Sequence, residues 1–211
     1  MITASVVGAT GYTGAVLTDI LASHPDVRLK ALTSKSYVGR SVSEVFPHLR
    51  VEGVYAQYSL EAVAGSNVVF VCYPHGEAHE VVAVLVDSEC RVVDLSADFR
   101  LTDPHAYADW YGFVHPRPDL VAAAVFGLPE LHRSRIARAR LVANPGCYPT
   151  GMLMGLLPIA EEIDPAKFRP SDTPISYADP AKFKRQTGWE PRISFEQTCV
   201  DILNDWRARI K

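Results

Sequence analysis

The stretch "SVVGATGYTGAVLTDIL", residues 5–21, has the pattern of a strand, a glycine-rich loop and a helix. Its glycines follow the spacing G-x-x-G-x-x-G, and each has a distinct use. Gly8 allows a tight turn off the strand, Gly11 lets a pyrophosphate approach the backbone, and Gly14 lets the helix pack near the strand. The helix N-terminus offers N–H groups and partial positive charge to phosphates. The stretch therefore predicts a dinucleotide site, the alternative being a glycine-rich turn without a ligand.

The alternation of strand and helix patterns continues through the first 160 residues. Short β-branched runs occur at 5–7, 27–32, 68–72, 92–95 and 141–143. Two intervening segments have helical spacing, with the apolar faces Val16, Leu17, Ile20 and Leu21 in one and Val81, Val82 and Leu85 in the other. The alternation predicts an α/β fold, a doubly wound, Rossmann-like and mostly parallel sheet with helices on both faces.

The residues after the second predicted strand bear on the choice of dinucleotide. An NAD site usually has an acidic residue here, which binds the ribose hydroxyls. This chain has Thr33, Ser34, Lys35 and Ser36 instead. A lysine with three hydroxyls suits a 2′-phosphate, so the sequence favours NADP. The alternative for Lys35 is a solvated loop charge.

A second motif, "NPGCYPTG" at residues 144–151, places Cys147 between glycine and proline residues. Pro149 fits the first turn of a helix, and apolar helical residues follow it. Cys147 is therefore expected at a helix start, where the helix dipole favours a thiolate. The run at 141–143 would place it at the carboxyl edge of the sheet, the edge that also carries the glycine loop. The alternative is a buried structural cysteine, which suits Cys72 and Cys199 better.

Composition excludes several other classes of protein. The chain has 211 residues and a net charge of -3, which gives no strong field for nucleic acid. We expect no membrane span, since no apolar run reaches about 18 residues, and no signal peptide at the N-terminus. The four cysteines have no C-x-x-C pairing and are expected to be free thiols in the cytoplasm. His75 and His79 have metal-pair spacing, but no third ligand is evident, so no metal is predicted.

The composition changes near residue 164, where a stretch rich in proline and polar residues begins. A final helix is then expected, with Ser194 as its N-cap and Gln197 three residues on. Its apolar face consists of Phe195, Cys199, Ile202, Leu203, Trp206 and Ile210. We therefore predict a domain of residues 1–163 and a C-terminal segment, 164–211, whose amphipathic helix packs on that domain.

Residues 1 to about 163 resemble the N-terminal part of the N-acetyl-γ-glutamyl-phosphate reductases, NADPH-dependent enzymes of arginine biosynthesis. The matching stretches, in family order, are "VGATGYTGAVL", "HPDVRLKALTSKSYVGRSVSEVFPHL", "VFVCYPHGEAHEVV", "VVDLSADFRL", "FGLPEL" and "LVANPGCYPTGMLMGLLP". The resemblance implies that Cys147 is a nucleophile that forms a thioacyl-enzyme with loss of phosphate, and that hydride from NADPH then releases the semialdehyde.

The resemblance also implies roles for other residues. The cofactor would be held by Gly8, Thr10, Gly11, Tyr12, Thr13, Gly14, Ser34 and Lys35, with Pro74, His75 and Gly76 on the nicotinamide side. Ser96, Arg100 and Asn144 would lie near the substrate. From the residues alone, "DLSADFRL" is also compatible with a loop in which Asp94, Asp98 and Arg100 pair with one another.

The sequence departs from this family after the cysteine motif. The family continues into a substrate and dimerisation domain with a histidine acid/base, whereas His132 is the last histidine here. The residues from 164 instead resemble the C-terminal end of the GDP-mannose 4,6-dehydratases, in which the "RPSD" stretch (Arg169 and Asp172) helps hold a nucleotide-sugar. That family's Tyr-x-x-x-Lys pair is missing. The chain is thus interpreted as a chimera.

These observations are compatible with three alternative functions. The first is an acyl-phosphate reductase acting on a small molecule, weakened because general acid–base help and substrate positioning are lost. The second is an NADP-binding module without catalysis. The third is a nucleotide-sugar dehydratase or reductase. Without the family's dimerising domain, a monomer is the default expectation.

Overall fold

The computed structural model describes residues 1–156 and, beyond them, positions 184–185, 188, 190, 194, 197, 200–201 and 204. The chain divides into two units, Met1–Ala160 and Glu161–Lys211. The predicted boundary after residue 163 and the predicted packing of the final helix lie outside the described residues. Within the second unit, the backbone N–H of Gln197 donates to Ser194 Oγ at 3.1 Å, which confirms the expected N-cap.

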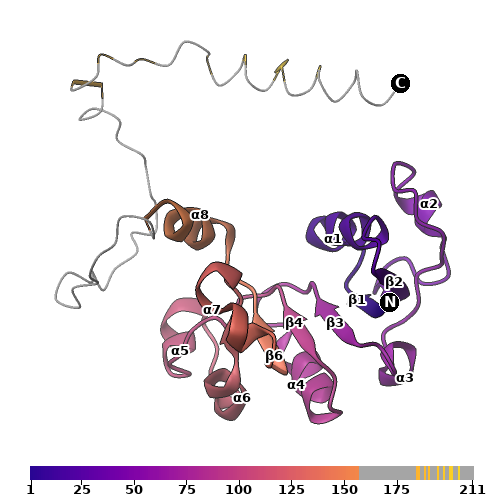
Figure 1. Ribbon diagram of the computed structural model, residues 1–211, viewed down its shortest axis with the longest axis horizontal. Helices are drawn as coiled ribbons and strands as arrows, with labels where there is room; N and C mark the ends of the chain where they lie inside the picture. Colours follow the sequence, from indigo (N-terminus) through magenta and orange to yellow (C-terminus); the bar gives the residue numbers. More distant parts are fainter. Residues whose placement is uncertain are drawn as a thin grey trace. The chain divides into compact units, whose positions relative to one another are not determined.

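A six-stranded sheet forms the centre of the first unit (Figure 1). All described strand pairs are parallel, and the strand order is β2-β1-β3-β4-β6-β5. The strands are β1 (Ile2–Val7), β2 (Val27–Thr33), β3 (Val68–Val71), β4 (Val92–Asp94), β5 (Val125–Phe126) and β6 (Leu141–Ala143). The predicted Rossmann-like α/β fold is therefore confirmed.

Helices occupy the connections between the strands. They are α1 (Tyr12–Ala22), α2 (Val42–Val45), α3 (Leu60–Val63), α4 (His79–Asp87), α5 (Ala106–Tyr111), α6 (Pro118–Ala123), α7 (Pro129–Ile136) and α8 (Cys147–Leu156). Among the described residues, no helix is long and apolar enough to cross a membrane. The two helices expected from apolar spacing correspond to α1 and α4.

Alternate residues of the strands contribute to two separate cores. Ala4 and Val6 of β1 pack with Ala15 and Leu21 of α1 in one core. The other core joins Val69 and Val71 of β3 to Val82 and Leu85 of α4, and also contains Tyr107, Leu120 and Val121. Because neighbouring strand residues point to opposite faces, α1 and α4 cover opposite faces of the sheet.

The buried face of α1 differs from the predicted one. Val16 and Ile20 are 61% and 59% exposed, whereas Gly14, Ala15, Thr18 and Leu21 are buried. The buried Thr18 hydroxyl donates to the Gly14 carbonyl at 2.7 Å, so this polar side chain packs without an unpaired donor. The predicted burial of Val16 and Ile20 is therefore wrong. The prediction placed only apolar residues on the buried face, whereas Thr18 can be buried because its hydroxyl is hydrogen-bonded within the helix.

The strands end in register along one edge. Thr33, Val7, Val71, Asp94, Ala143 and Phe126 are successive partners from β2 to β5. The loops that follow all six strands therefore leave the sheet from one line of residues. In open parallel sheets this carboxyl edge is where ligands bind.

Candidate functional site

The edge order brings the glycine loop and Cys147 to the same side of the fold. The loops after β1, β3, β4 and β6 follow one another across the sheet, since these strands are neighbours in that order. With strands spaced about 4.8 Å apart, β1 and β6 lie about 14 Å from each other. A ligand that extends from the glycine loop to Cys147 would thus run past the loops after β3 and β4.

The glycine loop uses two of its glycines for packing and leaves the third open. Gly8 has φ +79°, and a Cβ there would lie 2.9 Å from the Cys72 carbonyl oxygen. A Cβ at Gly14 would lie 2.3 Å from the Gly8 carbonyl oxygen, closer than any side chain tolerates. A Cβ at Gly11 would meet only the Gly8 carbonyl oxygen, at 3.8 Å. Gly11 thus has open space beside it, and its predicted contact with a pyrophosphate stays a prediction.

The N-terminus of α1 has no side-chain cap. Gly11 is the N-cap residue and provides no side-chain acceptor, so the first N–H groups are left for another partner. Tyr12 is 95% exposed, and Thr13 is also exposed. Beside them lies a hollow of about 270 Å³, lined by Thr10, Gly11, Tyr12, Tyr37, Val45 and Phe46.

The loop after β2 is joined to the glycine loop through Ser34. Its hydroxyl lies 2.9 Å from Thr10 Oγ1 and accepts hydrogen bonds from the backbone N–H groups of Ser36 and Tyr37. Ser34 is only 3% exposed, so it orders the loop from within. Its predicted contact with a 2′-phosphate is not tested by this arrangement.

Lys35 has a carboxylate partner from another loop. Its ammonium group lies 2.8 Å from Glu77 Oε2 and 4.5 Å from the centre of the Tyr73 ring. The hydrogen bond to Glu77 raises the pKa of Lys35. Both partners are more than half exposed, so the pair is weak enough to open for a ligand. The predicted role of Lys35 toward a 2′-phosphate stays a prediction.

Cys147 is exposed and is the first residue of α8, at the helix start that the sequence predicts. It lines a cleft of about 920 Å³. The cleft brings together four of the predicted site residues, Thr13, Arg100, Asn144 and Cys147. The other described residues along its wall are Leu95, Gly127, Leu128, Pro129, Glu130, Pro145, Gly146, Thr150, Gly151 and Met154.

Arg100 holds the base of this cleft together. Its Nε donates to the Asn144 carbonyl at 2.7 Å, and its Nη2 donates to the Leu95 carbonyl at 2.8 Å. Its Nη1 lies 3.1 Å from where a Cβ of Gly146 would be, so a side chain at position 146 would press on this guanidinium group. The loops after β4 and β6 are therefore linked by one guanidinium group.

The suggested mutual pairing of Asp94, Asp98 and Arg100 is wrong. Arg100 uses backbone carbonyls, and the two carboxylates have separate partners. Asp94 accepts from the backbone N–H and the hydroxyl of Ser96, at 3.0 and 2.7 Å. Burial raises the pKa of Asp94 from its ordinary 3.8 to about 6.

Ser96 is only 4% exposed and uses its hydroxyl inside the loop, donating to Asp94 and accepting from the Asp98 backbone N–H at 3.0 Å. It is not among the described residues that line the cleft. Its predicted substrate contact stays a prediction.

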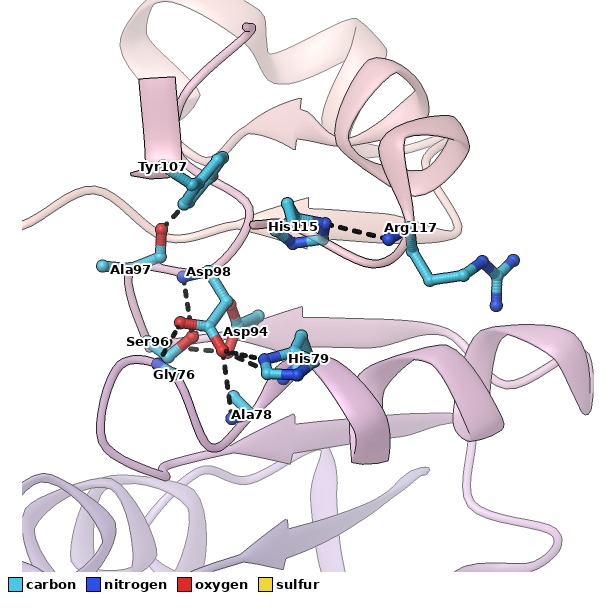
Figure 2. Close-up of polar contacts among 10 residues, drawn as sticks. All are labelled: Gly76, Ala78, His79, Asp94, Ser96, Ala97, Asp98, Tyr107, His115 and Arg117. Carbon is cyan, nitrogen blue, oxygen red and sulfur yellow. Dashed lines mark hydrogen bonds and ion pairs between the residues drawn. The ribbon is translucent and has the colours of Figure 1, made fainter. Parts of the chain in front are cut away.

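The loop after β3 carries Pro74, His75 and Gly76. Pro74 and His75 are exposed, and the Glu77 N–H donates back to the Pro74 carbonyl at 3.3 Å. Gly76 has φ +77°, as the third position of a type II turn requires. In Figure 2, Gly76, Ala78 and His79 surround the carboxylate of Asp98.

The two histidines of this loop do not act as a pair. His75 lies near Tyr111, with ring centres 5.7 Å apart. His79 Nδ1 lies 3.2 Å from Asp98 Oδ2. Within the described part of the chain, no group of three histidine, cysteine, aspartate or glutamate residues is placed to hold a metal ion.

The segment around β5 also lines the cleft, although its sequence predicts no role for it. Gly127 packs so closely on β6 that a Cβ would lie 2.8 Å from Val142 Cγ1. Pro129 starts α7, and Glu130 in its first turn faces the cleft. Two signals were present in "FGLPEL", a proline fit for the first helical position and an acidic residue directly after it. The strand itself, with two residues, is too short for a periodicity pattern.

Family comparisons divide the chain into two parts. Residues 3–139 match the family described as "Semialdehyde dehydrogenase, NAD binding domain". Residues 158–202 match the family described as "GDP-mannose 4,6 dehydratase". Both resemblances expected from the sequence are thus confirmed.

Individual relatives agree with the first match. The chain is 47% identical over 176 residues to an N-acetyl-gamma-glutamyl-phosphate reductase of Nitrosococcus oceani, covering 79% of this chain and 50% of the relative. It is 47% identical over 164 residues to the reductase of the same name from Saccharophagus degradans, covering 77% and 47%. The chain therefore spans about half the length of the curated relatives it matches.

A solved structure supports the fold. Aspartate semialdehyde dehydrogenase from Candida albicans, crystallised with NADP, has a TM-score of 0.58 to this structure at 16% identity. The match covers 77% of this chain and 47% of that protein. At this identity the likeness concerns the arrangement of strands and helices alone.

Proposed function

The chain belongs to the family of semialdehyde dehydrogenase NAD-binding domains, and from this membership we propose that it is an NADP-dependent acyl-phosphate reductase with Cys147 as its nucleophile. The substrate of the proposal is N-acetyl-γ-glutamyl phosphate, the compound in the names of the relatives. The product is the corresponding semialdehyde, an intermediate of arginine biosynthesis.

One observation carries the proposal. The cleft of about 920 Å³ joins Thr13, at the start of the glycine-loop helix, to the exposed Cys147 at the start of α8. The proposed nucleophile and a residue from the start of the proposed dinucleotide-binding helix thus line one cavity at the carboxyl edge of the sheet. Arg100 lies in the same cavity and suits the negative charges of an acyl-phosphate substrate.

The chemistry follows from these positions. The Cys147 sulfur attacks the acyl carbon, and a C–S bond forms as the C–O bond to phosphate breaks and inorganic phosphate leaves. The first N–H groups of α8 and the Arg100 guanidinium are the positive groups beside the reacting carbonyl and phosphate. When bound, NADPH supplies the hydride that reduces the thioester, after which the C–S bond breaks and the thiolate is regenerated.

The residues after β2 support NADP over NAD. This loop has no acidic residue to bind the ribose hydroxyls and has Ser34 and Lys35 instead. The Lys35 ammonium group, now paired with Glu77, would exchange this carboxylate for a 2′-phosphate. The glycine loop, through Gly11, would hold the pyrophosphate.

A second candidate is an NADP-binding module without turnover. It is favoured by the cleft wall, which has no histidine among its described residues. General acid–base assistance is usually worth two to four orders of magnitude in rate. The nucleotide-sugar function rests on the match at residues 158–202 and is opposed by the missing Tyr-x-x-x-Lys pair.

The experiment that tests the proposal combines a binding titration with an assay. NADPH binding is followed by its fluorescence, and phosphate-dependent reduction of NADP is measured with N-acetylglutamate semialdehyde. The proposal expects activity that is lost in Cys147→Ser while NADPH binding is kept. Cys90→Ser is the matched control, because Cys90 precedes β4 and so lies toward the opposite edge of the sheet. Binding without Cys147-dependent turnover would leave the binding module, and binding of a GDP-sugar in place of NADP would contradict both.

The proposal extends to the setting of the protein. Cys72, Cys90 and Cys147 are free thiols in the structure, which fits a reducing compartment such as the cytoplasm. The expected partner is a small molecule, without nucleic acid or membrane, and the expected state is a monomer. Size-exclusion chromatography with light scattering tests the oligomeric state.

A further inference from the structure

Asp98, in the loop after β4, has a fully buried carboxylate with four hydrogen-bond partners (Figure 2). Its Oδ1 accepts from the Gly76 N–H at 2.7 Å. Its Oδ2 accepts from the backbone N–H groups of Ala78 and His79, at 3.0 and 2.9 Å, and lies 3.2 Å from His79 Nδ1. Every one of these partners belongs to the segment that follows β3.

This carboxylate caps α4 from another part of the chain. The N-cap residue of α4 is Ala78, which has no side-chain acceptor of its own. Asp98 supplies the acceptor for the backbone N–H groups at the start of the helix, which have no partner within the helix. Its negative charge is also favoured at a helix N-terminus. These charge-assisted bonds offset the cost of burying the carboxylate.

The bonds also fix the turn that precedes the helix. Gly76 lies within the turn closed by Pro74 and Glu77, while Ala78 and His79 lie just after it. Asp98 therefore binds the turn on both sides of Glu77. The buried carboxylate thus ties this exposed turn to the loop that follows β4.

The anchor is itself held rigidly. The Asp98 backbone N–H donates to Ser96 Oγ, and the buried Tyr107 hydroxyl accepts from the Leu101 N–H and donates to the Ala97 carbonyl. Figure 2 shows Tyr107 and Ser96 on either side of the Asp98 segment. The imidazole of His79 stacks on Phe113, with ring centres 5.4 Å apart. The segments after β3 and β4 thus form one connected unit.

The place of the anchored turn suggests its use. Along the carboxyl edge, the loop after β3 follows the glycine loop and precedes the loops that carry Arg100 and Cys147. A dinucleotide with its pyrophosphate at Gly11 and its reactive ring near Cys147 would have to pass this turn. Its adenosine half would lie toward β2, where its 2′-phosphate would take the place of Glu77 at Lys35.

We propose that Asp98 is a positioning residue for the cofactor: it holds the Pro74–Gly76 turn against the nicotinamide half of NADP and takes no part in holding the adenosine half. The inference rests on the proposed binding of NADP. Asp98 does not touch the cofactor itself, since its carboxylate is buried beneath the turn. Its removal therefore selectively weakens ligands that carry the nicotinamide ring.

The test compares two ligands on the full chain. NADPH carries both halves of the cofactor, and adenosine 2′,5′-bisphosphate carries only the adenosine half. Asp98→Asn keeps the side-chain shape but removes the charge that strengthens the bonds to the turn. It should raise the Kd for NADPH about tenfold, shift the emission of the bound reduced nicotinamide, and leave the Kd for adenosine 2′,5′-bisphosphate within about twofold.

Asp87→Asn is the matched control, because Asp87 is at the other end of α4 and binds the Arg117 side chain at the surface. It should leave both dissociation constants unchanged. Equal weakening of both ligands by Asp98→Asn, or no weakening of either, would overturn the inference. Failure of the wild-type chain to bind NADPH would instead remove the proposed function on which the inference rests.

If Asp98→Asn does not melt cooperatively and is therefore not folded, Gly76→Ala tests the role of the turn instead. This substitution strains the same turn at a positive φ, and its Cβ would meet only Phe113, at 4.0 Å. Selective loss of NADPH binding in a folded Gly76→Ala protein would support the inference. Unchanged NADPH binding, or an equal loss for both ligands, would overturn it.

Discussion

Substituting Gly14 and Gly11 separates the two uses of the glycine loop. In Gly14→Ala the new Cβ would lie 2.3 Å from the Gly8 carbonyl oxygen and 2.7 Å from Ala9 Cα. Both are backbone atoms, so α1 has to move away from the loop. Overpacking of this kind costs up to about 3 kcal/mol, and the better helix propensity of alanine regains about 1 kcal/mol. We expect a net loss of about 2 kcal/mol, which lowers the melting temperature by about 4–8 °C.

Gly11→Ala is the matched substitution three residues earlier. Gly11 has φ −73° and ψ 164°, a conformation open to alanine, and its Cβ would meet only one atom, at 3.8 Å. Alanine is a poorer N-cap than glycine, but it also lowers the entropy of the unfolded chain, and the two effects are each below about 1 kcal/mol. The melting temperature should therefore stay within about 2 °C. NADPH binding should be lost, because the methyl group fills the space left for the pyrophosphate.

Circular dichroism melts without ligand and fluorescence titrations with NADPH measure these two effects. We expect both variants to bind NADPH poorly and only Gly14→Ala to lose stability. A Gly14→Ala protein that melts like the wild type would refute the packing argument. A Gly11→Ala protein that binds NADPH normally would refute the assignment of the phosphate site.

Three further predictions concern titration, thiol reactivity and cofactor choice. Burial raises the pKa of Asp94 to about 6, so the stability that its protonation provides is fully present below pH 3.8 and is lost as the pH rises through 6. The free energy of unfolding of Asp94→Asn, relative to that of the wild type, should therefore rise by up to about 3 kcal/mol between pH 4 and 7 in thermal melts. A difference in stability between the two proteins that does not change with pH would be inconsistent with this. Iodoacetamide should modify exposed Cys147 well before Cys72, whose pKa burial raises to about 12; peptide mass spectrometry at pH 8 would expose the opposite order. Glu77→Gln frees Lys35 and should tighten NADPH binding by no more than about fivefold without tightening NADH binding, while an equal gain for both ligands would argue against a 2′-phosphate at Lys35.

Local signals in the sequence were enough for the main elements of the site. The glycine spacing predicted both the strand–loop–helix unit and the tight packing at Gly14, because a missing Cβ is a local property. The proline and glycine residues around Cys147 likewise predicted a helix start. Parallel strand patterns then brought both motifs to one edge of the sheet, since carboxyl ends of parallel strands share that edge.

Other features depended on contacts between distant segments. Asp98 binds residues about twenty positions earlier, and nothing in "DLSADFRL" indicates which donors surround its carboxylate. The Thr18 hydroxyl is hydrogen-bonded within α1, so Thr18 is buried and the buried face of the helix differs from the predicted apolar face. The wall of the cleft around Glu130 follows a two-residue strand, which has no periodicity to recognise.

The most direct test of the central claim is a single-turnover reaction at Cys147. The wild-type chain is mixed with NADP and N-acetylglutamate semialdehyde in the absence of phosphate, and the protein mass and NADPH absorbance are measured together. The thiol adds to the aldehyde, hydride passes to NADP, and the resulting thioester cannot be released without phosphate. We expect one N-acetylglutamyl group on the peptide that contains Cys147, with an equal amount of NADPH. No adduct, or an adduct that persists in Cys147→Ser, would contradict it.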